Sequence, residues 1–241
     1  VDPDNGTSTA LPVELSFSPG SHPNTLLDLG FTGLMTNGSA DYGTLYDPGA
    51  LTAGGAANVL TLDEATEGDA IDDDQEQAFQ LGIAPGTDTF TVHATLQAPF
   101  PSSTTPENFQ SQGVYVGTGD QDNYAKLVVN ANDGDGGVQL ATETNGSFDE
   151  AANPTAPSVL GDGKTIDIYL QVDPATGDVL ASYSVDGGPR VTVGETTVPT
   201  SWFDGSDRGV AVGVISTSTG PGDPFPVTWS QLDVQQGASA T

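Results

Sequence analysis

A polar turn followed by an aromatic and a basic residue carries the side chains best suited to binding a ligand. Asp120, Asp122 and Asn123 lie in this turn, and Tyr124 and Lys126 follow it. Sugar recognition uses carboxylates and amides that pair with neighbouring hydroxyls, and an aromatic ring that covers the C–H side of the sugar. The sequence therefore predicts a ligand-binding set made up of Gln112, Tyr115, Asp120, Asp122, Asn123, Tyr124 and Lys126. The alternative is a plain hairpin turn whose Asp and Asn side chains bind their own backbone.

Two acidic segments, residues 69–76 and 132–135, contain the oxygen ligands that calcium prefers. Calcium binds about six to eight oxygens from clustered carboxylates and carbonyls. Neither segment has the spacing of an EF-hand loop, and a chain this acidic also gathers carboxylates by chance. If calcium is bound, we expect its ligands to come from Asp72, Asp73, Asp74, Asp133 and Asp135.

The familiar catalytic motifs are missing from the sequence. Glycosidases need two carboxylates that flank the scissile bond, whereas Glu143 and Asp167 each stand alone on a predicted strand. His93 lies among threonines on the polar face of a strand, and His22 lies in a loop beside a proline. No serine-nucleophile, zinc-peptidase or phosphate-loop motif occurs. The sequence therefore predicts no catalytic residue, and a chain that is not an enzyme.

Three Asn-x-Ser/Thr sequons begin at Asn5, Asn37 and Asn145, and each has glycine in the middle. Glycosylation at such turn-like positions would be tolerated in an exported protein. Short sequons also occur by chance, and Asn-Gly is itself a turn signal. All three asparagines are candidate glycosylation sites.

Charge is the strongest signal in the composition. The 241-residue chain has 33 acidic and 4 basic residues, a formal net charge of −29. The acidic residues are spread along the chain, which favours a surface adapted to molar salt, where the Debye length falls to roughly 3 Å. The alternative is a calcium-saturated protein from ordinary salt. We expect neither nucleic acid nor an anionic membrane as a partner, because no basic patch exists to bind phosphate.

Other features of the composition exclude several classes of protein. Cysteine is absent, so the chain has no disulfide, thiolate nucleophile or cysteine-ligated zinc. No apolar stretch reaches the length of a membrane span, and no signal peptide remains. Hydrophobic residues make up 35% of the chain, and its 31 glycines bring the apolar fraction into the ordinary globular range.

The predicted ligand residues lie on a meander of strands and tight turns between Gln112 and Leu140. Gly113–Val116 and Tyr124–Val129 are expected strands, and Val138 begins the next one. A meander needs other strands to cover one of its faces. Its alternation assigns four residues to the core side, namely Val114, Val116, Leu127 and Val129.

The rest of the chain supplies further strands. Residues 13–17, 89–96, 165–172 and 227–234 alternate between apolar and polar residues. Residues 209–215 form a nearly continuous apolar run, which is typical of a strand buried on both faces. Residues 63–76 and 145–157 are expected to be loops.

About a dozen strands without a convincing helix predict an all-β fold, a two-sheet antiparallel β-sandwich or jelly roll. We expect the strand at 13–17 to pair with the one at 227–234. We also expect a single domain over residues 1–241, with flexible ends at about 1–10 and 235–241.

Several segments carry a likeness to a known family. They read QSQGVYVGTGDQDNYAKLVV, IDIYLQVDPATGDVLASYSVDGG and GVAVGVISTS. A Gly-Val-x-Val strand leads into an Asp/Asn-rich turn that ends in Asn-Tyr, and a later strand pair closes on a Ser-x-Asp-Gly-Gly turn. Over roughly Phe109 to Val234, the chain resembles the concanavalin A-like lectin/glucanase superfamily in its laminin-G-like form. The stretch that begins GTLYDPGAL resembles a strand set in extracellular haloarchaeal proteins.

The resemblance implies a concanavalin A-like jelly roll, often with sugar bound on the concave face. Catalytic members carry closely spaced Glu and Asp on one strand, of the type E-x-D-x-x-E, and this sequence has no such run. We therefore expect a non-catalytic, salt-adapted carbohydrate-binding domain, outside the cell or at its surface, with a glycan as its partner. One alternative is a structural or adhesive surface protein, or a fibre subunit, that contacts copies of itself through strand edges and flexible ends. Another is an accessory domain of a larger surface enzyme.

Overall fold

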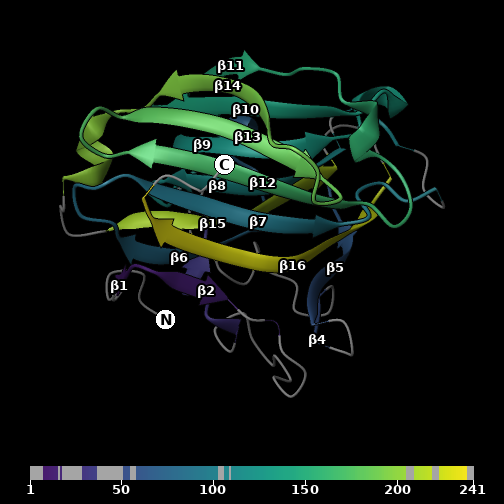
Figure 1. The fold of residues 1–241 in the computed structure, drawn as a ribbon, viewed down its shortest axis with the longest axis horizontal. Coiled ribbons are helices and arrows are strands. Elements are labelled where there is room, and N and C mark those ends of the chain that lie inside the picture. The colour runs from purple at the N-terminus through teal and green to yellow at the C-terminus, as the bar shows by residue number, and fades with distance from the viewer. Residues whose placement is uncertain are drawn as a thin grey trace.

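Two β-sheets packed face to face make up the part of the chain that the structure describes (Figure 1). Its helical segments are short 3-10 turns at Ala70–Asp72, Asn132–Gly134, Pro157–Val159 and Thr200–Phe203. The predicted all-β, two-sheet antiparallel sandwich is therefore confirmed. The structure is a computed structural model, and it describes residues 8–15, 17, 29–36, 51–54, 58–102, 106–108, 110–204, 209–218 and 223–237. No helix among these residues has the length and apolarity that a membrane span needs.

The first sheet, sheet A, has the strand order β1-β6-β15-β8-β9-β10-β11, and β3 pairs with β6. Its strand pairs are antiparallel except for β1 with β6. The strands are β1 (Thr9–Ala10), β3 (Gly33–Leu34), β6 (Ala78–Ala84), β8 (Gln110–Gly117), β9 (Asn123–Asn130), β10 (Gly137–Thr144), β11 (Ser147–Ala152) and β15 (Val210–Ser218).

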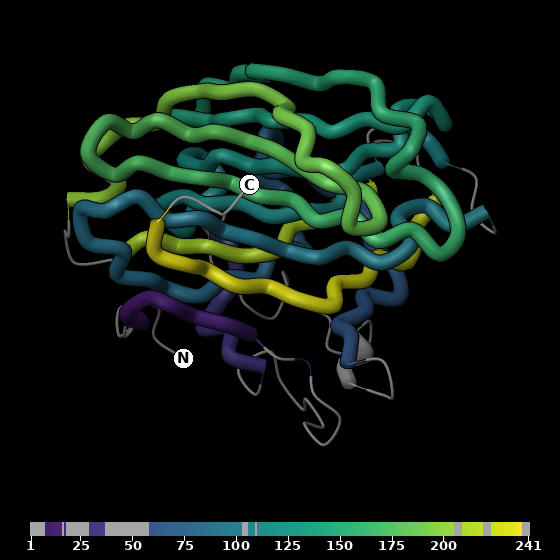
Figure 2. Tube along the Cα trace, viewed as in Figure 1, coloured from purple at the N-terminus to yellow at the C-terminus, as the bar shows by residue number. Residues whose placement is uncertain are grey.

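The second sheet, sheet B, has the order β14-β13-β12-β7-β16-β5-β4, and β2 pairs with β16. Its strands are β2 (Val13–Leu15), β4 (Leu51–Gly54), β5 (Val59–Ala65), β7 (Phe90–Gln97), β12 (Thr165–Asp173), β13 (Asp178–Val185), β14 (Val191–Thr197) and β16 (Phe225–Gln236). In Figure 2 the purple start of the chain lies beside the yellow end. Val13 pairs with Val234 and Leu15 with Leu232, as predicted for these terminal strands.

The main hydrophobic core lies between the two sheets. The four meander residues that the alternation assigned to the core, Val114, Val116, Leu127 and Val129, are fully buried in it, so this prediction is confirmed. Trp229 on β16 is also fully buried, and its indole Nε1 donates a hydrogen bond to the Gly113 carbonyl of β8 at 3.3 Å. This bond joins sheet B to sheet A through the core.

The outer faces of the two sheets differ. In β12 every second residue is partly exposed, which is typical of a sheet with one solvated face. β8 and β15 are buried along their whole length, as predicted for residues 209–215. A second apolar cluster covers the outer face of sheet A, and it consists of Met35, Ala70, Ala78, Tyr115, Tyr124, Val128 and Ile215. The segments that carry Met35 and Ala70 therefore lie over this face.

Both predicted loops contain more regular structure than expected. Residues 63–65 continue β5, and β11 forms within 145–157 and pairs with β10. The sequence of β11, SFDEAA, is exposed almost throughout, so it shows no apolar alternation. Asn145 and Gly146 have φ angles of 50° and 72°, the conformation that a two-residue hairpin turn needs. The prediction of a loop was wrong because an exposed edge strand has no core-facing pattern to reveal it.

Candidate functional site

The predicted ligand-binding residues are divided between the two faces of sheet A. Tyr115 pairs with Lys126 across β8 and β9, and Tyr124 lies two residues along β9 from Lys126, so these three point outward. Gln112 is three residues from Tyr115 along β8 and therefore points between the sheets. All four side chains are buried. The structure thus brings three of them together and separates Gln112 from them.

The turn before β9 is held by its own side chains. The Asp120 carboxylate accepts hydrogen bonds from the Asp122 backbone N–H at 3.2 Å and from Asn123 Nδ2 at 3.0 Å. Its other oxygen accepts from Thr118 Oγ1 at 2.7 Å. Asp120 and Asn123 therefore bind groups within their own turn, which is the alternative interpretation of a plain hairpin turn. The side chain of Asp122 is exposed.

The acidic segment after β5 contacts the outer face of sheet A through an ion pair. Lys126 Nζ lies 3.2 Å from Asp69 Oδ1, and both side chains are largely buried. The same ammonium lies 5.7 Å from the centre of the Tyr124 ring. A buried ammonium needs such partners. The positive charge of Lys126 is therefore already paired with Asp69, in a position covered by the acidic segment.

Asp73 is brought close to the turn before β9. It follows the 3-10 turn Ala70–Asp72 and has a φ angle of 58°. Burial raises its pKa, and the nearby carboxylates of Asp122 and Asp120 raise it further. Two candidates that the sequence had kept apart, the polar turn and the first acidic segment, therefore share one surface.

The predicted calcium ligands lie in two separate places. Asp72, Asp73 and Asp74 lie in the acidic segment, where Asp74 Oδ1 already accepts a hydrogen bond from the Asp69 N–H at 2.7 Å. Asp133 and Asp135 lie in the turn between β9 and β10 and are exposed. In the described ranges, no group of three or more His, Asp or Glu side chains is arranged to hold a metal ion. Calcium binding stays a prediction for solution measurements.

Glu143 is a candidate site residue that the sequence interpretation did not include. It lies on β10, directly opposite Tyr124 of β9 on one side and Phe148 of β11 on the other. Directly paired residues share a face, so these three side chains form a row on the outer face of sheet A. Glu143 stood alone in the sequence because both neighbours come from other strands. The Asn145-Gly146 hairpin signal could have paired it with Phe148.

The environment of Glu143 favours its protonated form. The side chain is 2% exposed, and its Oε2 has no hydrogen-bond partner. Burial raises the pKa of Glu143, and the carboxylates of Asp122 and Asp73 raise it further, although Tyr124 and Lys126 oppose the shift. We refer to Asp73, Asp122, Tyr124, Glu143 and Phe148 as the Glu143 cluster.

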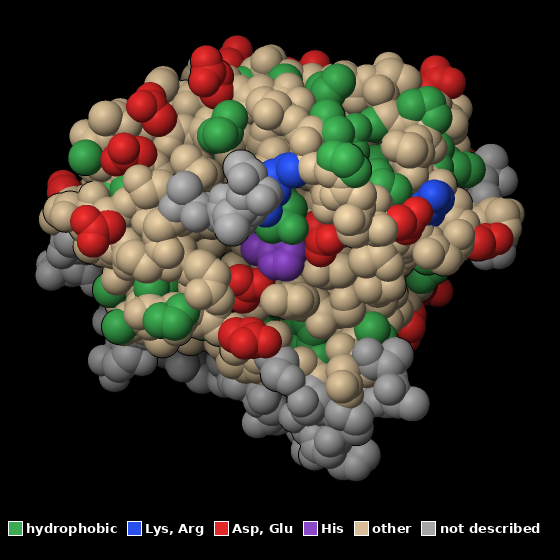
Figure 3. Space-filling model, viewed as in Figure 1, with side chains coloured by type: hydrophobic (Ala, Val, Ile, Leu, Met, Phe, Trp, Pro, Cys, Tyr) green, Lys and Arg blue, Asp and Glu red, His purple; other side chains and the backbone are tan. Residues whose placement is uncertain are grey.

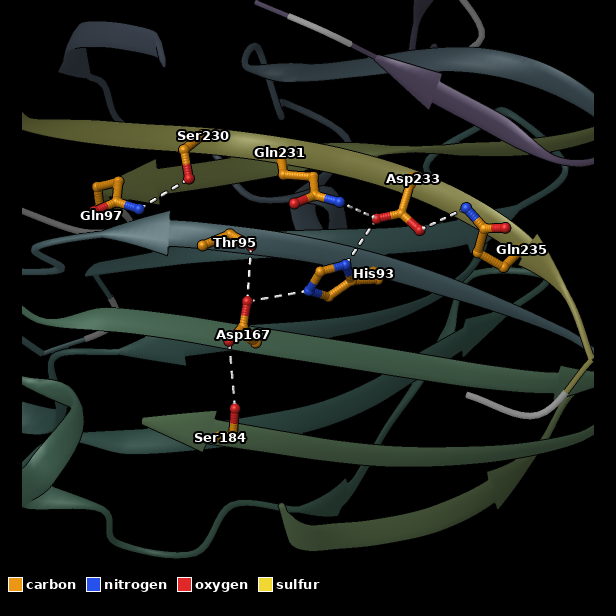
Figure 4. Close-up of polar contacts among 9 residues, drawn as sticks. All are labelled: His93, Thr95, Gln97, Asp167, Ser184, Ser230, Gln231, Asp233 and Gln235. Atoms are coloured by element: carbon orange, nitrogen blue, oxygen red, sulfur yellow. Dashed lines mark hydrogen bonds and ion pairs between the residues drawn. The ribbon is translucent and has the colours of Figure 1, made fainter. Parts of the chain in front are cut away.

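A second polar cluster, the His93 network, lies on the outer face of sheet B. Figure 4 shows His93 of β7 between Asp233 of β16 and Asp167 of β12. His93 Nδ1 lies 2.7 Å from Asp233 Oδ2, and His93 Nε2 lies 3.1 Å from Asp167 Oδ1. On this face a histidine is flanked by acidic side chains (Figure 3). The network links three neighbouring strands through side chains.

Every group in the His93 network is matched by a partner. Burial lowers the pKa of His93, but its hydrogen bonds to Asp167 and Asp233 outweigh burial and raise the pKa to about 9. The bond to His93 in turn holds the pKa of Asp167 below its usual range. The Tyr169 ring stacks on His93 at 4.5 Å between centroids, and the Arg190 guanidinium lies 3.6 Å from the Tyr169 ring centre. The Tyr169 ring is therefore already covered by His93 and Arg190.

The two clusters differ in the chemistry that they allow. Cleavage of a glycosidic bond by two carboxyl groups needs one that carries a proton and one that is ionised. The His93 network offers ionised Asp167 bound to a cationic imidazole, whereas Glu143 has a raised pKa and a free oxygen. The Glu143 cluster is therefore the better candidate for acid–base chemistry.

A hollow of about 550 Å³ also opens on sheet B, at the hairpin between β12 and β13. It is lined by Thr89, Gln171, Asp173, Asp178, Val179, Leu180, Glu195, Thr196 and Thr197. Asp173 and Asp178 bind groups of their own turn, the Ala175 N–H and the Thr176 hydroxyl. The hollow therefore lies on the opposite sheet from the Glu143 cluster, and two of its carboxylates are already bound within their own turn.

The predicted glycosylation sites are only partly described. Asn145 lies in the exposed hairpin turn between β10 and β11, and its N–H donates to Asn123 Oδ1 at 3.0 Å. Asn5, Asn37 and the loop histidine His22 lie outside the described residues. Glycosylation of Asn145 stays a prediction.

Comparisons with known proteins show what the fold resembles. No protein-family profile and no curated protein matches the chain. A GH43 protein from Bacillus licheniformis, BlXynB, is 14% identical with a TM-score of 0.60, and the match covers 75% of this chain and 33% of that one. An engineered GH43 glycoside hydrolase with endo-xylanase and exo-arabinofuranosidase activity is 18% identical with a TM-score of 0.59, covering 79% and 37%. A functionally unknown protein from Saccharomyces cerevisiae is 19% identical with a TM-score of 0.56, covering 80% and 95%.

These neighbours correct the functional expectation from sequence. The hydrolases among them contradict the expectations of a non-catalytic domain and of a chain that is not an enzyme. The sequence argument relied on the missing E-x-D-x-x-E run, and carboxyl groups that meet from different strands leave no such run. The chain spans about a third of the length of these hydrolases, and at identities this low the likeness establishes the fold alone.

Proposed function

We propose that this chain acts on carbohydrate and that the Glu143 cluster cleaves a glycosidic bond. The observation that carries the proposal is Glu143 itself, a buried carboxyl with a raised pKa and an unpartnered oxygen beside two exposed carboxylates. A carboxyl group with a raised pKa close to a second carboxyl group is the arrangement that glycoside hydrolysis uses. The fold shared with GH43 chains supports the same class of reaction.

The cluster divides the roles between two residues. Glu143 donates its proton to the oxygen of the leaving sugar as the glycosidic C–O bond breaks, and a solvent water that gives a proton to the second carboxylate adds to the anomeric carbon. Asp122 is the second carboxylate, because it is the strongest acidic neighbour of both Glu143 and Asp73 and its side chain is exposed. Since Glu143 must carry a proton to act, we expect activity to fall as the pH rises through its raised pKa.

The test is the release of reducing sugar from xylan, arabinoxylan and xyloglucan in molar NaCl. Xylan comes first because one neighbour of this fold is an endo-xylanase. We expect Glu143→Gln and Asp122→Asn each to lower kcat by about a hundredfold or more, since a missing acid or base typically costs that much. Asp135→Asn, which removes an exposed carboxylate from another turn, is the matched control and keeps full activity.

A second measurement separates loss of chemistry from loss of folding. Gln removes a carboxyl that burial destabilises when it is ionised, so at pH 8 we expect the thermal midpoint of Glu143→Gln to equal or exceed that of the wild type. An inactive variant with a lowered midpoint would assign Glu143 a structural role. A wild-type rate in Glu143→Gln would overturn the proposal.

A further inference from the structure

Phe148 is an unusual aromatic residue for this fold. Of the large hydrophobic side chains that the structure describes, Ile71, Phe148, Leu180 and Val191 are exposed, and Phe148 is the one aromatic among them. It is 36% exposed, whereas the largest fully buried side chains are nearly all aromatic. An exposed phenyl ring leaves apolar surface in contact with water unless something covers it.

The position of Phe148 places its ring beside the proposed acid. Phe148 and Glu143 are direct partners in the β10–β11 pair, so both side chains leave the same face of sheet A. The hairpin that precedes Phe148 lies against the turn before β9, since the Gly146 N–H donates to the Asp122 carbonyl at 3.2 Å. The ring, the acid and the second carboxylate therefore border one surface.

The charge of this surface is unbalanced. The Asp122 carboxylate raises the pKa values of both Asp73 and Glu143, which means that added negative charge at this surface is unfavourable. The nearby cation, Lys126, is already paired with Asp69. A uronic acid would bring another carboxylate into this surface, where the described residues offer no further cation to receive it.

We infer that the substrate of the Glu143 cluster is an uncharged glycan, one sugar ring of which lies on Phe148, and that Asp73 and Asp122 exclude glycans that carry carboxylates. The phenyl ring covers the C–H face of the sugar, and the two aspartates set the charge that is accepted. The reaction in this inference rests on the proposed function. The contacts of Phe148, Asp73 and Asp122 with the glycan affect binding, so they can be measured without catalysis.

The experiment compares uncharged arabinoxylan with polygalacturonate. We expect Phe148→Ala to raise KM for arabinoxylan roughly three- to tenfold with kcat unchanged, because stacking acts on bound substrate and transition state alike. Phe148→Trp restores the wild-type KM. Leu180→Ala, which removes an equally exposed side chain (38%) from sheet B, leaves KM unchanged.

The charge arm uses the pair Asp73→Asn and Asp122→Asn, measured as retardation in gels that contain each polysaccharide. We expect the wild type to be retarded by arabinoxylan and not by polygalacturonate, and the double variant to be retarded by both. The pair Asp133→Asn and Asp135→Asn, which removes the same charge from another turn, should behave as the wild type does. Equal KM values for Phe148→Ala and Leu180→Ala, or equal retardation of the wild type in both gels, would overturn the inference.

Gel retardation also distinguishes this inference from the proposed function. If Glu143→Gln kept full activity, or if the wild type cleaved no glycan, the proposed function would fail. Retardation by arabinoxylan that depends on Phe148 would still support the inference in that case. Absence of any retardation by arabinoxylan would overturn it.

Discussion

Glu143 and His93 are both titratable side chains in the middle of a strand, and their neighbours determine what each can do. His93 has a carboxylate at each ring nitrogen, so its charged form is stabilised. Glu143 is buried, and burial raises its pKa more than the neighbouring Tyr124 and Lys126 lower it. The first arrangement is suited to holding strands together, and the second is suited to moving a proton.

At the residue scale, His93 gives stability a defined pH dependence. Its pKa is about 9 when folded and 6.5 in the unfolded chain, so its contribution is fully present below pH 6.5 and is lost as the pH rises through 9. The full contribution is roughly 3 kcal/mol. We expect the free energy of unfolding, measured by urea titration in molar salt, to fall between pH 6.5 and 9 in the wild type and not in His93→Gln.

The exposed ion pair between Lys164 and Asp186 provides the control for this measurement. Asp186→Asn removes that pair from the same sheet, and we expect it to leave the pH dependence unchanged. The same slope in the wild type and in His93→Gln would show that the imidazole is not cationic in the folded protein.

At the scale of elements, the sequence predicted the strands that face the core and missed what the outer faces hold. Val114 and Leu127 could be assigned because period-two alternation follows from burial of one face. The exposed strand β11 follows no such rule, and without β11 the neighbour of Glu143 was unknown. The Glu143 cluster could not be predicted because its members come from three strands, the turn before β9 and the segment after β5.

A prediction at this scale concerns the close approach of β15 to β6. A Cβ atom added to Gly213 would lie 2.0 Å from the Phe79 carbonyl oxygen, which is too close for any contact. We expect Gly213→Ala to lower the free energy of unfolding by roughly 2 kcal/mol or more, as is common when a buried backbone must shift. Thermal unfolding in molar salt measures the loss.

Gly33→Ala is the matched control for this change. Gly33 lies on β3 in the same sheet, and an added Cβ there would have no atom within 4 Å. We expect its free energy of unfolding to stay within about 0.5 kcal/mol of the wild type or to rise, because alanine restricts the unfolded chain. Equal losses for the two variants would contradict the packing argument.

At the scale of the whole molecule, the surface charge outweighs local contacts. The chain carries a net charge of −29, and its described cations are engaged: Lys126 with Asp69, Lys164 with Asp186, and Arg190 with Tyr169. Few ion pairs offset the repulsion between carboxylates, so the remaining means of reducing it is the surrounding salt. A location outside the cell in a saline medium stays a prediction.

The corresponding prediction is a strong dependence of stability on salt. We expect the thermal midpoint to rise by about 10 °C or more between 0.1 and 3 M NaCl, equivalent to a few kcal/mol for a domain of this size. KCl should act equally, because screening depends on ionic strength. A midpoint that is independent of NaCl would contradict the charge argument. A midpoint that rises only in sulfate would also contradict it, and would point to exclusion of the salt from the protein surface.

The indole of Trp229 gives these experiments an optical signal. It is fully buried between the sheets, and its one hydrogen bond reaches across the core to the Gly113 carbonyl. An indole in such a dry environment emits at short wavelength, and water entering the space between the sheets shifts that emission to the red. Because Gly113 belongs to the strand before the ligand turn, the emission of Trp229 in a Trp202→Phe background follows separation of the two sheets, whereas ligand contacts on the outer faces leave it unchanged.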